Sequence, residues 1–236
     1  WIEYINRLIG AIAGLSVLML FINSLKFIKK KRSITILTFI SLIGILFQAW
    51  LGKTVVDSNL LAGKITIHML MAILIVSVLF ILLSKLNAKD SDLVFNRYIS
   101  NLTLISLAFL IIQVLSGTEV RQFIDIEMLS NNYSEKHKWL MNPPESFYFH
   151  RSFSIIIFSV NSLIFIRLKK MIIDSKIFKI IMLLLFIQIL TGIIMYYFNF
   201  PFSTQPIHLL ISSLIIGFQV YFYVLLNNKK NYGIKN

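Results

Sequence analysis

Seven long runs of mostly apolar residues constrain the fold of this 236-residue chain more than any other feature. They cover residues 2–25, 34–51, 65–84, 98–117, 147–166, 177–199 and 207–226. An α-helix needs about 20 apolar residues to cross the hydrocarbon core of a bilayer. Because backbone polar groups in lipid must be satisfied within their own segment, each run is predicted to be a transmembrane helix. The sequence therefore predicts an all-α membrane protein.

The distribution of basic residues predicts how the helices are oriented. The formal net charge of +13 would by itself suit a nucleic-acid partner. Most of the 23 Lys and Arg residues, however, lie between helices on one predicted membrane face or in the C-terminal tail, namely Lys26, Lys29, Lys30, Lys31, Arg32, Lys85, Lys89, Arg97, Arg167, Lys169, Lys170, Lys176, Lys179, Lys229, Lys230 and Lys235. The positive-inside rule makes this face and the C-terminus cytoplasmic. The charge is thus a topology signal, and no nucleic-acid partner is expected.

Two stretches of the chain repeat each other at a nearly constant offset. The matched residues at an offset of 140 are Gln48, Gly52, Asn59 and His68 in the first copy and Gln188, Gly192, Asn199 and His208 in the second. Upstream, Tyr4-Ile5-Asn6-Arg7 matches Tyr148-Phe149-His150-Arg151 at an offset of 144. These matches indicate an internal duplication in which the two copies run in the same direction.

The duplication predicts the domain organisation. The second half contains four apolar runs, whereas the first contains three that match the last three of the second. We therefore expect two pseudo-symmetric four-helix bundles in residues 1–90 and 91–236, with cofactor sites between facing helices. Seven helices of an expected eight are present, and the eighth is expected before Trp1.

The histidines of the repeat are candidate metal ligands. His68, His150 and His208 lie in the first turns of helices that enter the membrane from the predicted outer face. In the second half, His150 and His208 can face each other across the bundle, and two imidazoles can bind haem iron from both axial sides. In the first half the corresponding pair is Asn6 and His68, and a neutral amide is a poor iron ligand. The glycines of the repeat would allow a flat macrocycle or another helix to approach closely.

Charged residues at the helix starts differ between the copies. Arg151 can pair with a haem propionate, since guanidinium binds carboxylates bidentately, and Arg7 is its counterpart in the first half. Glu3 lies three residues before Asn6 on the same helical face, and its counterpart in the second copy is Phe147. This asymmetry suggests a stable electron-transfer cofactor in the second half and a reactive or exchangeable one in the first.

Each candidate also has a purely structural interpretation. A His near a helix end is commonly an interfacial or hydrogen-bonded residue, and the glycines and glutamines can serve helix packing alone. Glu3 can be a helix N-terminal acid favoured by the helix dipole. His137 lies in the longest predicted loop, residues 118–146, and is expected to be exposed to solvent.

At these positions the sequence resembles the haem A synthase family of respiratory-chain assembly. The resemblance is carried, in chain order, by Glu3-Tyr4-Ile5-Asn6-Arg7, the segment from Gln48 to His68, Gly117-Thr118-Glu119-Val120-Arg121, His150-Arg151-Ser152-Phe153-Ser154 and Pro206-Ile207-His208. It spans essentially the whole chain. The chain departs from the family pattern at Asn6, where a His is usual, and in having no cysteine.

The resemblance implies a function and a set of site residues. The function is the oxidation of the C8 methyl group of haem O to the formyl group of haem A, by successive hydroxylations, for cytochrome c oxidase assembly. Haem b would be held by His150 and His208, and His68 would ligate the substrate haem O. Glu3 would match the acidic residue thought to act in catalysis.

The same resemblance implies partners and a location. The expected partners are haem O, the haem O synthase that supplies it, a membrane electron donor and the lipid bilayer, and both a monomer and a homo-oligomer stay open. The expected location is a bacterial inner membrane, with the haem sites near the outer face. Two other functions are considered, a b-type cytochrome that changes no haem and a membrane transporter. The transporter fits less well, because the repeat is parallel and its polar residues lie near one face.

Overall fold

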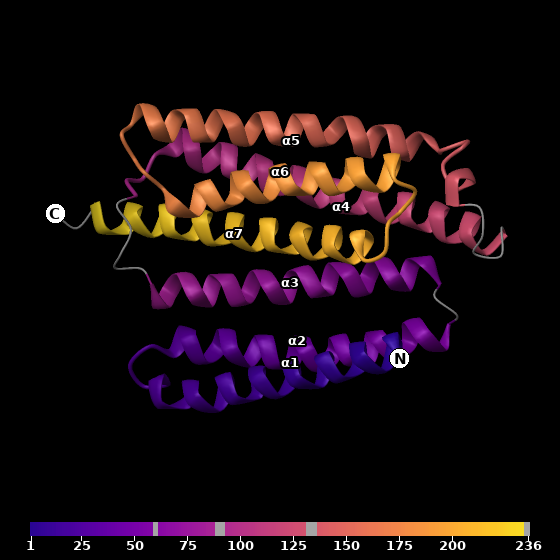
Figure 1. The fold of residues 1–236 in the computed structure, drawn as a ribbon. Coiled ribbons are helices and arrows are strands. Elements are labelled where there is room, and N and C mark those ends of the chain that lie inside the picture. Colours follow the sequence, from indigo (N-terminus) through magenta and orange to yellow (C-terminus); the bar gives the residue numbers. More distant parts are fainter. Residues whose placement is uncertain (59–60, 88–92, 131–135, 234–236) are drawn as a thin grey trace. The chain divides into compact units, whose positions relative to one another are not determined.

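The computed structural model describes residues 1–58, 61–87, 93–130 and 136–233, and all regular structure in these residues is helical (Figure 1). The elements are α1 (Ile2–Ser24), η1 (Leu25–Phe27), α2 (Arg32–Asp57), α3 (Ala62–Leu86), α4 (Arg97–Ser130), η2 (Lys136–Lys138), α5 (Glu145–Lys170), α6 (Lys176–Tyr197) and α7 (Thr204–Gly233). The seven α-helices are each long and apolar enough to cross a membrane. The prediction of an all-α membrane protein with seven spanning helices is confirmed.

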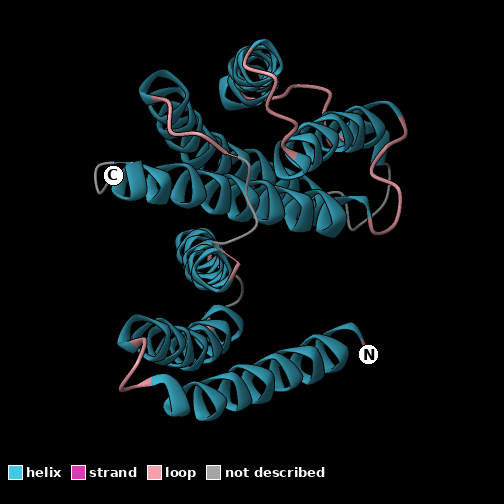
Figure 2. Cartoon of the chain, turned by 90° about the vertical axis from the view of Figure 1, so that its left-hand side faces the viewer, coloured by secondary structure: helices cyan, strands magenta, loops and turns pink. Residues whose placement is uncertain are grey.

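The chain divides into two compact units, residues 1–88 and 89–236. In the first unit α2 packs against both α1 and α3. In the second unit α4 pairs with α5 and α6 pairs with α7, while α4 also contacts α7 and α5 also contacts α6. Figure 2 shows that loops and turns are confined to the ends of the described helices. Each unit is therefore built from antiparallel neighbours, and this arrangement brings the end of one helix beside the start of the next.

The burial pattern is that of helices packed in lipid. Small hydroxyl residues are buried, such as Thr38 and Thr103, which are both 0% exposed. Large apolar side chains face outward instead, such as Leu46 at 61% and Phe186 at 58% exposed. Lipid tails are as apolar as leucine, so close approach of helix backbones, rather than expulsion of water, drives packing in a bilayer. Small residues at the contacts allow that approach.

The second unit contains a fully buried polar cluster formed by Ser106 of α4, Asn161 of α5 and Gln219 of α7. The Asn161 side-chain amide donates to Ser106 Oγ at 2.8 Å, and the Gln219 amide donates to the same oxygen at 2.9 Å and to Asn161 Oδ1. Three helices are thereby joined through buried polar side chains, which in lipid must find their hydrogen-bond partners within the protein. This cluster, which we call the polar clamp, fixes α4, α5 and α7 in one mutual register.

The helix over residues 98–117 is longer than predicted. α4 continues to Ser130, so residues 118–130 are helical and the predicted loop over 118–146 is wrong in this part. The extension has its own buried side, since Ile124 is 3% exposed. Arg121 and Asp125 also form an i,i+4 ion pair at 3.5 Å, a spacing that supports a helix. The charged residues Arg121 and Asp125 therefore lie on the side of a helix that extends beyond its apolar run.

Candidate functional site

His150 and His208 lie close together in the second unit. They occupy the first turns of α5 and α7, and their ring centroids are 6.5 Å apart with an interplanar angle of 55°. An iron held between two imidazoles by bonds of about 2 Å would set the ring centroids about 6 Å apart. In the described part of the chain, no group of three or more His, Cys, Asp or Glu gathers at one place. The separation of the two rings therefore fits an ion held between two imidazoles.

The ring of His150 is oriented by the end of α4. Its Nδ1 lies 3.2 Å from the carbonyl oxygen of Gln113 and 3.1 Å from Ser116 Oγ. A carbonyl oxygen can only accept, so the proton of the neutral ring is on Nδ1. Ser116 in turn donates its hydroxyl proton to the Gln113 carbonyl at 3.0 Å. This leaves Nε2 of His150 unprotonated, with a lone pair available to a metal ion.

His208 is held in the same way by the end of α6. Its Nδ1 lies 2.8 Å from Thr191 Oγ1, which donates to the carbonyl oxygen of Gln188 at 2.9 Å. A hydroxyl has one proton, and Thr191 has already used it. The Nδ1 of His208 must therefore carry a proton and donate it to Thr191. Both imidazoles of the pair consequently present an unprotonated Nε2.

His68 of the first unit has a different environment. The side-chain nitrogen of Gln48 lies 3.2 Å from His68 Nε2 and 3.1 Å from the His68 carbonyl oxygen. Since that group touches a carbonyl oxygen, it is the amide NH2, and it donates to Nε2. His68 Nδ1 is buried and has no hydrogen-bond partner within the described residues. Leu51 stands where the other two sites have a hydroxyl.

A glycine faces each of the three imidazoles. A Cβ atom added to Gly117 would lie 2.9 Å from Cε1 of His150. The corresponding distances are 3.3 Å between Gly52 and His68 and 3.7 Å between Gly192 and His208. The glycines therefore make room for the edge of an imidazole ring, rather than only for another helix.

The sequence did not predict that Gln113 and Gly117 contact His150, although Gly117 belongs to one of the segments that carry the family resemblance. Gln113 and Gly117 form a third copy of the Gln-x3-Gly pattern already noted at Gln48 and Gln188, and the amide of Gln113 donates to the carbonyl oxygen of His150 at 2.9 Å. The sequence signal for this third copy was the spacing of four residues between the glutamine and the glycine. It was hidden because 32 residues separate Gly117 from its His, against 15 in each of the other two copies.

Of the other predicted site residues, Asn6, Arg7 and Arg151 have exposed side chains. Asn6 and Arg7 are exposed on α1, and no hydrogen bond in the described part of the chain joins Asn6 to His68. The side chains of Glu3 and His137, and the whole of Asn59, lie outside the described residues. Arg151 is exposed and lies over the rings of Phe147 and Tyr148, at 5.8 and 5.6 Å from the ring centroids.

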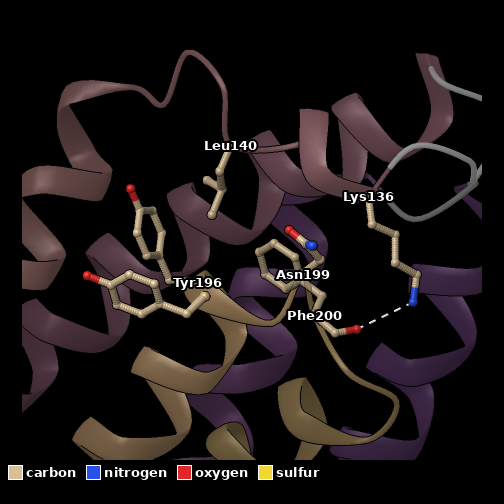
Figure 3. Close-up of a pocket in the computed structure, with 6 residues that line it drawn as sticks. Lys136, Leu140, Tyr196, Asn199 and Phe200 are labelled. Atoms are coloured by element: carbon tan, nitrogen blue, oxygen red, sulfur yellow. Dashed lines mark hydrogen bonds between the residues drawn. The ribbon is translucent and has the colours of Figure 1, made fainter.

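A small pocket of about 240 Å³ lies beside η2 in the second unit (Figure 3). It is lined by Lys136, Leu140, Tyr196, Tyr197, Asn199 and Phe200, and Lys136 donates to the carbonyl oxygen of Phe200 at 3.4 Å. None of its lining residues is a histidine. The candidate ligand pair is therefore a separate feature, formed by side chains packed between helices.

The fold and the site define a helical membrane protein in which two imidazoles from different helices lie 6.5 Å apart. A family model described as "Cytochrome oxidase assembly protein" matches residues 1–220, and the chain belongs to this family, COX15-CtaA. The "Heme A synthase" of Rickettsia prowazekii (strain Madrid E) is 26% identical to it, over 96% of this chain and 75% of that protein. The resemblance seen in the motifs is thus confirmed at the level of the family.

Proposed function

We propose that this chain is a haem A synthase, a membrane-bound oxidoreductase that converts the C8 methyl group of haem O to a formyl group by successive hydroxylations. The product would serve the assembly of cytochrome c oxidase. The observation that carries the proposal is the family match over residues 1–220, which includes all three candidate histidines. The relative named heme A synthase, similar over nearly the whole chain, supports it.

We assign the second unit to a resident haem b. Its iron would be held by Nε2 of His150 and of His208, both of which have their proton on Nδ1. Such a haem supplies one-electron transfer when bound. The chain itself orients the two rings through α4 and α6, and Arg151 offers an exposed guanidinium to a propionate.

We assign the first unit to the substrate, haem O. His68 would ligate its iron, and Asn6 and Arg7 would line the same end of the unit. Glu3 lies in the first turn of α1 and would supply the carboxylate for proton transfer next to the C8 methyl group. Because Asn6 is a weak ligand, His68 would be the one strong protein ligand of the substrate iron.

We further propose a bacterial inner membrane as the location. The basic loops and the C-terminus would face the cytoplasm, and both haem sites would lie near the outer face. The partners would be a membrane electron donor, the haem O synthase that supplies the substrate and the lipid bilayer, in a monomer or a homo-oligomer.

The function is tested by producing the full chain in cells that make haem O and identifying its haems as pyridine haemochromes. We expect b-type haem together with O-type haem and its hydroxylated or formyl products. Changing Glu3 to Ala should leave b-type haem in place and stop product formation. A protein that accumulates no oxidised haem with a working electron donor, and is indifferent to Glu3→Ala, would be an electron carrier instead.

The ligand assignment is tested by His150→Ala and His208→Ala, each of which should abolish the low-spin b-type spectrum. His68→Ala should remove O-type haem and spare b-type haem. His137→Ala is the matched control, since it changes the remaining histidine of the chain. A b-type spectrum that survives both changes in the second unit would refute the assignment.

A further inference from the structure

We propose that Ser116 and Thr191 are positioning residues that make His150 and His208 permanent iron ligands. We also propose that Leu51, at the corresponding position, makes His68 an exchangeable one. The inference rests on the proposed function. It concerns a single position, the third residue after the glutamine in each Gln-x3-Gly motif, which is occupied by Leu51, Ser116 and Thr191 in the three motifs.

In the second unit this position completes a relay of hydrogen bonds. The imidazole Nδ1 donates to the hydroxyl oxygen, and the hydroxyl donates to the carbonyl one turn earlier in its own helix. The distances from hydroxyl oxygen to Nδ1 are 2.8 Å at Thr191 and 3.1 Å at Ser116. An acceptor on the second ring nitrogen of a ligating His fixes its tautomer and orientation and makes it a stronger electron donor to the metal.

In the first unit the relay is absent. Leu51 is buried at 6% exposure and offers no acceptor, and the Nδ1 of His68 has no partner among the described residues. The Gln48 amide meanwhile occupies the Nε2 lone pair of His68 at 3.2 Å, closer than the 3.5 Å between the Gln113 amide and His150 Nε2. Iron must therefore displace the Gln48 amide and gains a less basic ligand.

The difference matches the tasks of the two units. A resident haem b has to stay bound through many electron transfers, whereas haem O must enter and its product must leave. A ligand without an acceptor behind it binds iron less tightly, and loss of such partners typically costs about 10–100-fold in metal affinity. One side chain per site thus distinguishes the unit that retains haem b from the unit that exchanges haem O for its product.

The test uses Thr191→Val and Ser116→Ala in the full chain, because valine keeps the shape of threonine and removes only the acceptor. We expect transfer of haem b to apomyoglobin to accelerate about 10-fold in Thr191→Val and less in Ser116→Ala, because His150 Nδ1 keeps the Gln113 carbonyl oxygen as an acceptor at 3.2 Å. The midpoint potential of haem b should rise, since a less basic imidazole stabilises the ferric state less. Thr191→Ser should give the release rate and the potential of the unchanged chain. If residue 191 acted through its shape alone, the hydroxyl of serine would not restore these values.

Thr103→Val is the matched control. Thr103 is a buried threonine whose hydroxyl donates to the carbonyl oxygen of Ile99 in its own helix. Its replacement by valine should leave the rate of haem b release and the midpoint potential unchanged. In the reciprocal variant Leu51→Thr, the new hydroxyl can donate to its own helix as Thr191 does and accept from His68. Release of O-type haem should then slow about 10-fold.

The outcomes separate this inference from the proposed function. If His150→Ala and His208→Ala leave the b-type spectrum intact, the ligand assignment fails. If those variants abolish it while Thr191→Val and Ser116→Ala change neither release rate nor potential, only the positioning role is overturned. Faster haem O release in Leu51→Thr would overturn the assignment of Leu51.

Discussion

At the scale of single residues, three glycines set how close an imidazole can come to the helix beside it. Gly117 leaves the least room, since an added Cβ would lie 2.9 Å from His150 Cε1. That ring cannot simply turn away, because its Nδ1 is held by the Gln113 carbonyl and by Ser116. The glycine and the hydrogen bonds therefore specify one ring position together.

This geometry predicts a graded alanine series. Gly117→Ala should push His150 out of its hydrogen bonds, at a cost of about 1–3 kcal/mol, and lower the yield of b-type haem. Gly192→Ala should be tolerated, since its Cβ would meet His208 at an ordinary 3.7 Å. The absorption of the low-spin haem per mole of purified protein measures both. Equal effects of the two changes would contradict the ring positions described above.

At the scale of helices, the polar clamp decides which surfaces of α4, α5 and α7 meet. Asn161 takes part twice, donating to Ser106 and accepting from Gln219, while also donating to its own helix at the carbonyl of Ile157. In lipid an unpaired amide has no water to turn to. The residues at offsets of 144 and 140 from Asn161 and Gln219 are Val17 and Leu79, so the clamp belongs to the second unit alone.

Breaking the clamp should destabilise the second unit. We expect Asn161→Leu to lower the stability of the second unit by about 1–2 kcal/mol, because the buried Gln219 amide and Ser106 hydroxyl each lose their hydrogen bond with Asn161. Thermal release of haem b from the detergent-solubilised protein would report the loss. Ser159→Ala serves as control, since its exposed hydroxyl bonds only the carbonyl of Ile155. A melting curve indistinguishable from that control would show that the clamp adds no stability.

At the scale of the whole molecule, the charge pattern predicts which loops lie on which side of the membrane. The chain has no cysteine, so any introduced cysteine is the one thiol present. Lys30, between α1 and α2, lies in a loop predicted to be cytoplasmic, whereas Met141 is 66% exposed in the connection predicted to be outside. The two positions therefore test the topology from opposite sides.

In intact cells a membrane-impermeant thiol reagent should label Met141→Cys and not Lys30→Cys. Opening the membrane should make Lys30→Cys reactive, because the inner basic loops become accessible only then. The unchanged chain is the control and should take up no label. Labelling of Lys30→Cys in intact cells would invert the proposed topology and place both haem sites at the inner face.

Much of this architecture could be predicted from the sequence, since helix number follows from apolar runs long enough to span a bilayer. The approach of His150 to His208 followed from their matched depth. The length of α4 could not be predicted from its apolar run, because the extension to Ser130 is stabilised by the burial of Ile124 and by an ion pair between Arg121 and Asp125. The roles of Ser116 and Thr191 depend on which hydroxyl faces which ring nitrogen, and periodicity alone does not specify that.

The Gln-x3-Gly motif recurs in three helix pairs that follow one another along the chain, and this recurrence bears on how the sequence of such a protein can evolve. Gln48, Gln113 and Gln188 each lie in a helix hairpin that sets a glycine of one helix against the His of the other. Under the proposed ligand assignment, each bond from a His to iron would thus be encoded in a contiguous piece of chain. A substitution inside one hairpin would then change the strength of its own bond and leave the bond from the other hairpin unchanged, so the two ligands of the proposed haem b would evolve separately.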